Sequence, residues 1–506
     1  MTKAMPIRTR RALAPLLLVL LSACPVLFAP VLPLLDLGGH LGHLAVQVDG
    51  GRSPELARWY GFSWALVPNL GVDLLVQTLA PWLGLEPAVR LLVSLIPPLQ
   101  VAAWFALSKS VHGRITPLVL LAAPLAYALP YQMGFLNFSL GVAVALMLLA
   151  LWVRLDCPEG RTAQVLAFVP LAFLLWVCHL SAFGIFGIAA FSVTFMHQRA
   201  TAPSAPVALA RTLAILLPLL SGPAAGFAFG TQGDPHEQTL WRPLVQKGFA
   251  LAKILRDLWQ PWDVAGALAL IGAVAWAWRS PRCRLDPGLA LATVLLFFAY
   301  LLLPDMLQGF SDTDTRLLPT LVGFALIAPA PRRDDNARQA PGRWLAHLTL
   351  AALLFSAMRL AGNTVSYVIL GRQFDRALAV VDAVPRGAAL ATLFIDTCER
   401  WNPDRRAHLG GYALARRHAY DSGQWAIPGG HFLQIRDAVL NRFFARYDVR
   451  TPLGACGQRP TASQTIAALP AKIDRLWIIG GPPRLAVAGW GLVRASGDST
   501  LYRRIR

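Results

Sequence analysis

Acidic residues are scarce in this chain of 506 residues. It carries 27 Asp and Glu against 46 Lys and Arg, and charged residues make up only 14% of the sequence. Soluble domains typically have about 25% charged residues, so the shortage argues against an ordinary soluble protein. The apolar fraction of 56% and the mean hydropathy of +0.51 predict instead a polytopic membrane protein.

Cysteine is also rare, with six in the whole chain. Four of them fall in apolar segments or in the cytoplasmic loops predicted below. Only Cys398 and Cys456 share a predicted oxidising compartment, so the sequence allows a single disulfide between these two. A disulfide-stapled scaffold is therefore excluded.

Nucleotide-binding motifs are missing as well. No mononucleotide loop and no GxGxxG stands between a strand and a helix, and the run around Gly480-Gly481 predicts a turn. The net charge of +19 resembles that of nucleic-acid-binding proteins, but the arginines lie in short loops between apolar runs rather than on one basic face. We therefore expect membrane lipids and phosphates as partners, and no nucleic acid.

Hydropathy predicts a mainly α fold, a transmembrane bundle of about 11 spans. The predicted spans are Leu13–Leu35, Ala88–Leu107, Ile115–Pro130, Phe135–Val153, Val165–Cys178, Ala182–Met196, Leu213–Phe229, Val264–Trp278, Leu289–Leu303, Leu317–Ala328 and Trp344–Met358.

Five arginine-rich loops orient these spans, because cytoplasmic loops are enriched in Lys and Arg. All five can be cytoplasmic together if Trp64–Leu83 lies at the interface rather than spanning, and if the chain turns sharply at His179. A single kinked span over 165–196 would instead reverse every later loop. The hairpin model places the N-terminus in the cytoplasm of a bacterium and a long first external loop, 36–87, outside the inner (plasma) membrane.

The composition changes after the last predicted span. Charged residues and β-type runs such as Leu476–Ile479 appear, and no further segment is long enough to span. The sequence thus predicts a transmembrane domain over 1–361 and a small extracytoplasmic α/β domain over 362–506.

Asp36 is the best clue to chemistry, because it lies where the first apolar run ends. On a helix, Asp36, His40 and His43 would share one face, since they are four and three residues apart. A carboxylate with two imidazoles suits general base catalysis or a divalent metal ion. The alternatives are a helix N-cap for Asp36 and interfacial positions for the histidines. His179 is expected at the same membrane face, either near this loop or satisfied between helices.

An acid stands right after the first span, followed by the entry Pro68-Asn69-Leu70 and the run Gly84–Leu91 before the second span. This layout resembles the glycosyltransferase C superfamily, and its protein mannosyltransferase-like and aminoarabinose transferase-like branches most of all. Asp314–Pro319 is similar to the Arg-Tyr-x-x-Pro motif that opens a late span in those enzymes. The second acid that often follows the first is absent, and Leu317 replaces the tyrosine.

The resemblance implies transfer of a sugar from a polyprenyl phosphate, such as undecaprenyl phosphate, to an acceptor that the sequence does not identify. Asp36 would then be the catalytic base or a metal ligand, and Arg316 would neutralise the lipid phosphate. His40 and His179 would contact substrate. His40 and His43 would hold a metal ion if one is used.

Two other classes of function fit a polytopic chain. A transporter or flippase would show paired discontinuous segments in matching halves, and the sequence has none. A noncatalytic scaffold would use the external domain to bind a partner. The long first loop together with a C-terminal external domain favours the enzyme.

Overall fold

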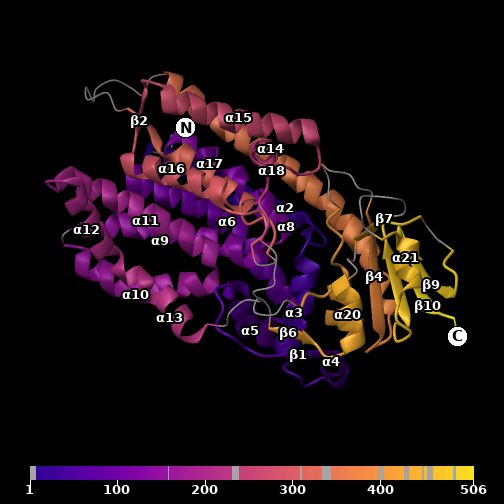
Figure 1. The fold of residues 1–506 in the computed structure, drawn as a ribbon. Coiled ribbons are helices and arrows are strands. Elements are labelled where there is room, and N and C mark those ends of the chain that lie inside the picture. Colours follow the sequence, from indigo (N-terminus) through magenta and orange to yellow (C-terminus); the bar gives the residue numbers. More distant parts are fainter. Residues whose placement is uncertain are drawn as a thin grey trace.

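The computed structural model describes residues 7–157, 159–230, 239–307, 310–332, 343–396, 401, 404–426, 432–446, 450–452, 460–482 and 486–505. Long helices lie side by side in a bundle, and a small sheet formed by the C-terminal region packs at one end of it (Figure 1). The mainly α fold with a C-terminal α/β region, predicted from the sequence, is confirmed.

Within the described ranges, seven helices are long and apolar enough to cross a membrane: Leu85–His112 (α6), Leu136–Leu155 (α9), Arg161–Cys178 (α10), Leu180–Thr201 (α11), Ala205–Phe229 (α12, η2 and α13), Gln260–Arg279 (α15) and the helix that begins at Arg343 (α18). Shorter apolar helical stretches stand at the other four predicted spans: Leu13–Phe28 (in α1 and α2), Pro117–Met133 (α7, η1 and α8), Pro287–Leu302 (α16) and Thr315–Ile327 (η3 and α17). The chain is a polytopic membrane protein.

The first predicted span differs from the expectation of one continuous helix over Leu13–Leu35. Helix α1 ends at Leu21, α2 covers only Cys24–Phe28, and the chain is irregular from there to Asp36. Pro30 and Pro33 lack the N–H groups that a helix needs, which explains the early end. Arg90 of α6 donates hydrogen bonds to the freed carbonyls of Ala29 (2.6 Å) and Pro30 (2.8 Å).

The five basic loops lie at one end of the bundle. Strands β2 (Cys283–Leu285) and β3 (Pro329–Pro331) join two of them, and Arg114 of a third donates to the Pro331 carbonyl (2.7 Å). Arg154 of the fourth donates to Ser110 (2.9 Å). The remaining loop follows His197, which contacts Asp156 of the fourth (2.8 Å). All five therefore lie on the same side, as the hairpin model requires.

A sharp turn at His179 joins α10 and α11. His179 has an extended backbone between the two helices, with φ −166° and ψ 127°. At the other end of the pair, Arg161 at the start of α10 and His197 near the end of α11 both contact Asp156. The two helices thus run antiparallel, and the single kinked span is wrong.

The C-terminal sheet is built around β4, which is Ala389–Asp396. Strands β5, β7 and β8 run parallel to β4, and β10 runs antiparallel to both β8 and β9. Nearly every residue of β4 is buried, as is typical of a strand covered on both faces. The other strands are Tyr420–Asp421 (β5), Arg450–Pro452 (β7), Arg475–Ile479 (β8), Trp490–Ser496 (β9) and Ser499–Arg504 (β10), and the helices are Gly410–Arg417 (α19), Ala438–Arg446 (α20) and Ala462–Ala467 (α21).

Helix α18 connects the bundle to this sheet as one element of 36 residues, Arg343–Leu378. It passes the predicted domain boundary at 361 without interruption, and a single 3-10 turn, Val381–Ala383, precedes β4. Cys398 and Cys456 lie outside the described residues, so their disulfide stays a prediction.

The first loop packs tightly against the C-terminal region. Its elements are α3 (Leu37–Asp49), α4 (Pro54–Trp59), β1 (Tyr60–Phe62) and α5 (Gly71–Leu83), and β1 pairs with β6 (Leu433–Ile435). Helix α3 presents glycines to the 408–425 segment: a Cβ on Gly38 would lie 2.1 Å from the His408 carbonyl oxygen, and one on Gly39 would lie 2.7 Å from the Trp425 ring. Glycine is required at both positions because the two backbones approach so closely.

Candidate functional site

A cavity of about 240 Å³ lies between the bundle, the first loop and the C-terminal region. Segments far apart in the sequence supply its polar side chains: Asp36 and His40 from the start of the first loop, Asn69 before α5, Asn137 from α9, His179, Arg316 from η3, and His408, Trp425 and Arg450 from the C-terminal region. The cavity therefore brings together Asp36, Arg316, His40 and His179, four of the five residues singled out in the sequence.

Asp36 precedes α3 at the N-cap position, but its side chain makes no capping hydrogen bond. The backbone is held by its own N–H, which donates to the Met133 carbonyl (2.9 Å). The carboxylate lies 3.8 Å from His408 Nε2. The predicted capping role is therefore wrong for the side chain, and the carboxylate is available to the cavity.

Burial dominates the electrostatics of Asp36. Loss of solvation raises the pKa of this carboxyl from 3.8 to about 7, although the positive charges of Arg450 and Arg316 oppose the rise. Asp312 adds a smaller negative contribution that raises the pKa further. A carboxyl with a pKa near neutrality can accept a proton and release it again at physiological pH.

Arg316 presents its guanidinium to the cavity. The guanidinium carbon lies 3.8 Å above the centre of the Phe135 ring, and Nη2 donates to the Ser311 carbonyl (2.8 Å). Its buried Nε has no hydrogen-bond partner, and no carboxylate among the described residues lies within 4 Å of the guanidinium. The positive charge of Arg316 is thus not neutralised by an ion pair and is available to bind an anion.

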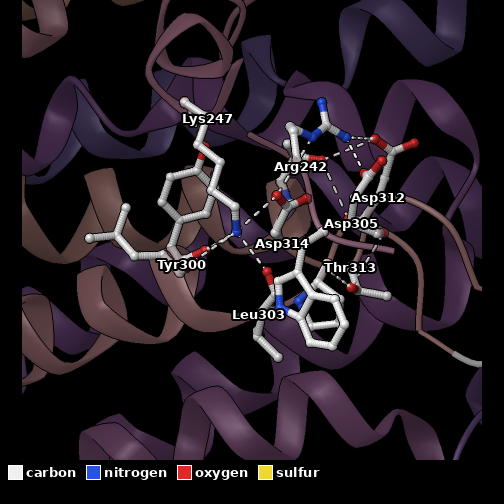
Figure 2. A network of polar contacts seen from close by, with 12 residues as sticks. Arg242, Lys247, Tyr300, Leu303, Asp305, Asp312, Thr313 and Asp314 are labelled. Carbon is white, nitrogen blue, oxygen red and sulfur yellow. Dashed lines mark hydrogen bonds and ion pairs between the residues drawn. The ribbon is translucent and has the colours of Figure 1, made fainter. Parts of the chain in front are cut away.

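A buried ionic network fixes the segment that carries Arg316 (Figure 2). Lys247 of α14 (Leu244–Ala252) lies 3.3 Å from Asp314 and donates to the carbonyls of Tyr300 (2.8 Å) and Leu303 (2.6 Å). Arg242 pairs with Asp305 and lies 3.1 Å from Asp312. Lys247 and Asp314 are almost fully buried, so these contacts are protected from water and hold the segment rigidly.

The histidines of the cavity are neutral at physiological pH. Burial lowers the pKa of His40 to about 4 and that of His408 to about 3. Both rings contact Trp425, with centroids 5.6 Å and 4.7 Å away. In His179, Nδ1 accepts a hydrogen bond from the Ser181 N–H (3.1 Å). These rings can therefore offer hydrogen bonds to a ligand without adding positive charge.

His43 does not join this cavity. Its Nε2 lies 3.1 Å from Asp73 Oδ1 on α5, and Asn137 Nδ2 donates to the other oxygen of that carboxylate (2.9 Å). Burial alone would raise the pKa of Asp73, but these partners hold it below its ordinary value. Among the described residues, no three His, Cys, Asp or Glu side chains are grouped to hold a metal ion. His40 and His43 thus differ in their surroundings, and a metal ion at this pair stays a prediction.

Three contributors to the cavity were not recognised in the sequence: His408, Trp425 and Arg450. His408 precedes α19, Trp425 follows β5 and Arg450 begins β7, and none of them lies in a motif. The only signal was indirect, since the glycines of α3 indicate that another backbone packs closely on that helix.

Comparison with protein-family models and with curated protein sequences finds no match. The structure is similar to crystal structures of ArnT from Cupriavidus metallidurans. The apo state matches with a TM-score of 0.53 at 14% identity, and the form bound to undecaprenyl phosphate matches with a TM-score of 0.50 at 13% identity. Each match covers 98% of both chains. The chain therefore shares the overall fold of these ArnT structures.

Proposed function

We propose that the protein is a cell-envelope glycosyltransferase that moves a sugar from a polyprenyl phosphate to an acceptor at the outer face of the bacterial inner membrane. The observation that carries the proposal is the shared cavity of Asp36 and Arg316, a buried carboxyl and an unpaired guanidinium at the junction of the bundle and the C-terminal region. The similar ArnT structure with bound undecaprenyl phosphate supports the class of donor.

Arg316 receives the phosphate of the donor. A guanidinium offers two parallel N–H groups to phosphate oxygens, and it stabilises the negative charge that develops when the phosphate leaves. Arg450, also in the cavity, adds to the positive potential felt by Asp36 and by any anion there.

Asp36 takes the proton of the acceptor. The acceptor atom attacks the anomeric carbon, the bond between that carbon and the phosphate oxygen breaks, and the bonding electrons leave with the polyprenyl phosphate. The acceptor proton passes to the Asp36 carboxylate and then to solvent. These steps use only side chains of this chain.

The arginine-rich loops indicate how the protein is oriented in the membrane. The end of the bundle with the five basic loops faces the cytoplasm, together with the N-terminus, and the cavity and sheet face the periplasm. A polyprenyl donor can then enter from the lipid, with its sugar in the water-accessible cavity.

Arg316→Lys tests the phosphate role. Lysine retains the charge but loses the planar fork, so we expect undecaprenyl phosphate to bind about 10-fold more weakly, the value of roughly one charge-assisted hydrogen bond. Binding is measured with purified protein in nanodiscs. Arg386→Lys, at an exposed pair with Glu55, is the matched control and should leave binding unchanged. Equal binding by wild type, Arg316→Lys and Arg316→Ala would contradict the role.

A second measurement tests the reaction. Membranes of a strain that lacks the native protein receive the wild-type chain and a labelled undecaprenyl-phosphate sugar, and release of sugar from the lipid is followed. We expect release that depends on Arg316. Lipid binding without any release of sugar would point to a transporter instead.

A further inference from the structure

A small recess opens beside the main cavity. It has a volume of about 20 Å³ and shares His40, Asn69, Asn137 and Trp425 with the cavity, so the two adjoin one another. Gln424 contributes to the recess but not to the main cavity, as do His43 and Asp73, which contact each other. Space of this size holds one water molecule or one hydroxyl group.

The side-chain amide of Gln424 is a polar group in this recess whose presence the fold itself does not explain. Its side chain belongs to a residue that is only 5% exposed, yet neither Nε2 nor Oε1 has a hydrogen-bond partner. Leaving a buried amide unpaired destabilises the folded protein, so this amide calls for a partner.

The neighbours of Gln424 show that the missing partner is not supplied by the fold. Asn137 accepts from the Val72 N–H and donates to Asn69 and Asp73, and both oxygens of Asp73 are also occupied. Helix α3 has Gly42 opposite the amide, where a Cβ would lie 2.3 Å from Oε1. The recess therefore has room for Gln424 and for one further small polar group.

A hydroxyl group complements this amide. It can donate to Oε1 and accept from Nε2, so a single hydroxyl satisfies both atoms of the amide. A sugar whose phosphate lies at Arg316 occupies the main cavity, and the recess borders that cavity at His40 and Trp425. The flat faces of aromatic rings such as Trp425 suit the apolar face of a sugar ring.

On the basis of the proposed function, we propose that Gln424 binds one hydroxyl of the transferred sugar. Gln424 is then a specificity-determining residue contributed by the C-terminal region.

The first test compares two ligands in nanodiscs: undecaprenyl phosphate alone and undecaprenyl phosphate that carries glucose. For Gln424→Leu we expect the glucose-bearing lipid to bind about 3- to 10-fold more weakly, the value of one neutral hydrogen bond, and the bare lipid to bind as in wild type. Gln77→Leu is the control, because Gln77 bonds Gln47 of α3 and lines neither space. Gln424→Glu keeps the shape of the side chain and serves if Gln424→Leu does not fold.

The second test identifies the hydroxyl. Wild type and Gln424→Leu are measured with lipids that carry a series of deoxy-glucoses. We expect one deoxy position at which the loss from removing the sugar hydroxyl and the loss from removing the Gln424 amide are not additive.

The outcomes separate the two proposals. If wild type binds neither lipid, the proposed function fails. If it binds both, but Gln424→Leu and Gln424→Glu weaken both equally or neither, the amide holds only an ordered water and the specificity role is overturned. Additive losses at every deoxy position would overturn it as well.

Discussion

The variant Asp36→Asn tests whether Asp36 serves catalysis rather than the stability of the fold. Asparagine keeps the shape of the side chain but cannot accept a proton at neutral pH. If Asp36 is the base, turnover should fall by about 100-fold or more, the usual contribution of a positioned base. Binding of undecaprenyl phosphate should not fall, because Arg316 is intact.

The stability of the folded protein should be equal or higher in Asp36→Asn, whereas its turnover falls. Burial raises the pKa of Asp36 from 3.8 to about 7, so the ionised carboxylate is disfavoured in the folded protein. A difference of this size corresponds to about 4 kcal/mol, at about 1.4 kcal/mol for each tenfold change in acidity. The penalty is absent below pH 4 and fully present above pH 7, where Asp36→Asn removes it. We expect the Tm of the variant to equal or exceed that of wild type at pH 8.

The pH dependence provides an independent check. The rate of wild type should rise about 10-fold from pH 6 to pH 8, because only the ionised form of a carboxyl with a pKa of about 7 acts as base. Sugar release from a labelled undecaprenyl-phosphate donor gives the rate, and thermal unfolding in detergent gives the Tm. Asp49→Asn, at the other end of α3, is the control. Undiminished turnover by Asp36→Asn would refute the reasoning.

Two further predictions concern the architecture. Gly39→Val should lower the Tm and the yield of folded protein, since its Cβ would lie 2.7 Å from the Trp425 ring, whereas Gly184→Val, whose Cβ meets nothing within 4 Å, should change the Tm little; equal Tm values would contradict the close packing of α3. A reporter inserted after Arg114 should read cytoplasmic and one in the turn at Gly497 periplasmic, and two signals from the same compartment would contradict the topology.

The sequence by itself determined the number and position of the apolar segments, because the cost of exposing polar groups in a bilayer acts on each span separately. It also determined that the basic loops share one side, and it pointed to Asp36 and Arg316, since both lie at the ends of apolar runs. The helix break at Pro30 and Pro33 could be predicted from the sequence. The sequence could not show that Arg90, which lies on another helix, donates hydrogen bonds to the carbonyl groups near this break.

Only the tertiary structure decided which residues share the cavity. Asp36, Arg316 and Arg450 lie far apart in the sequence, and no local pattern relates them. His40 and His43 are neighbours on one helix, yet His43 faces Asp73 while His40 faces the cavity, because the positions of α5 and of Trp425 select a different partner for each ring. Chemistry at such a site depends on packing between distant segments, and packing is a property of the whole fold.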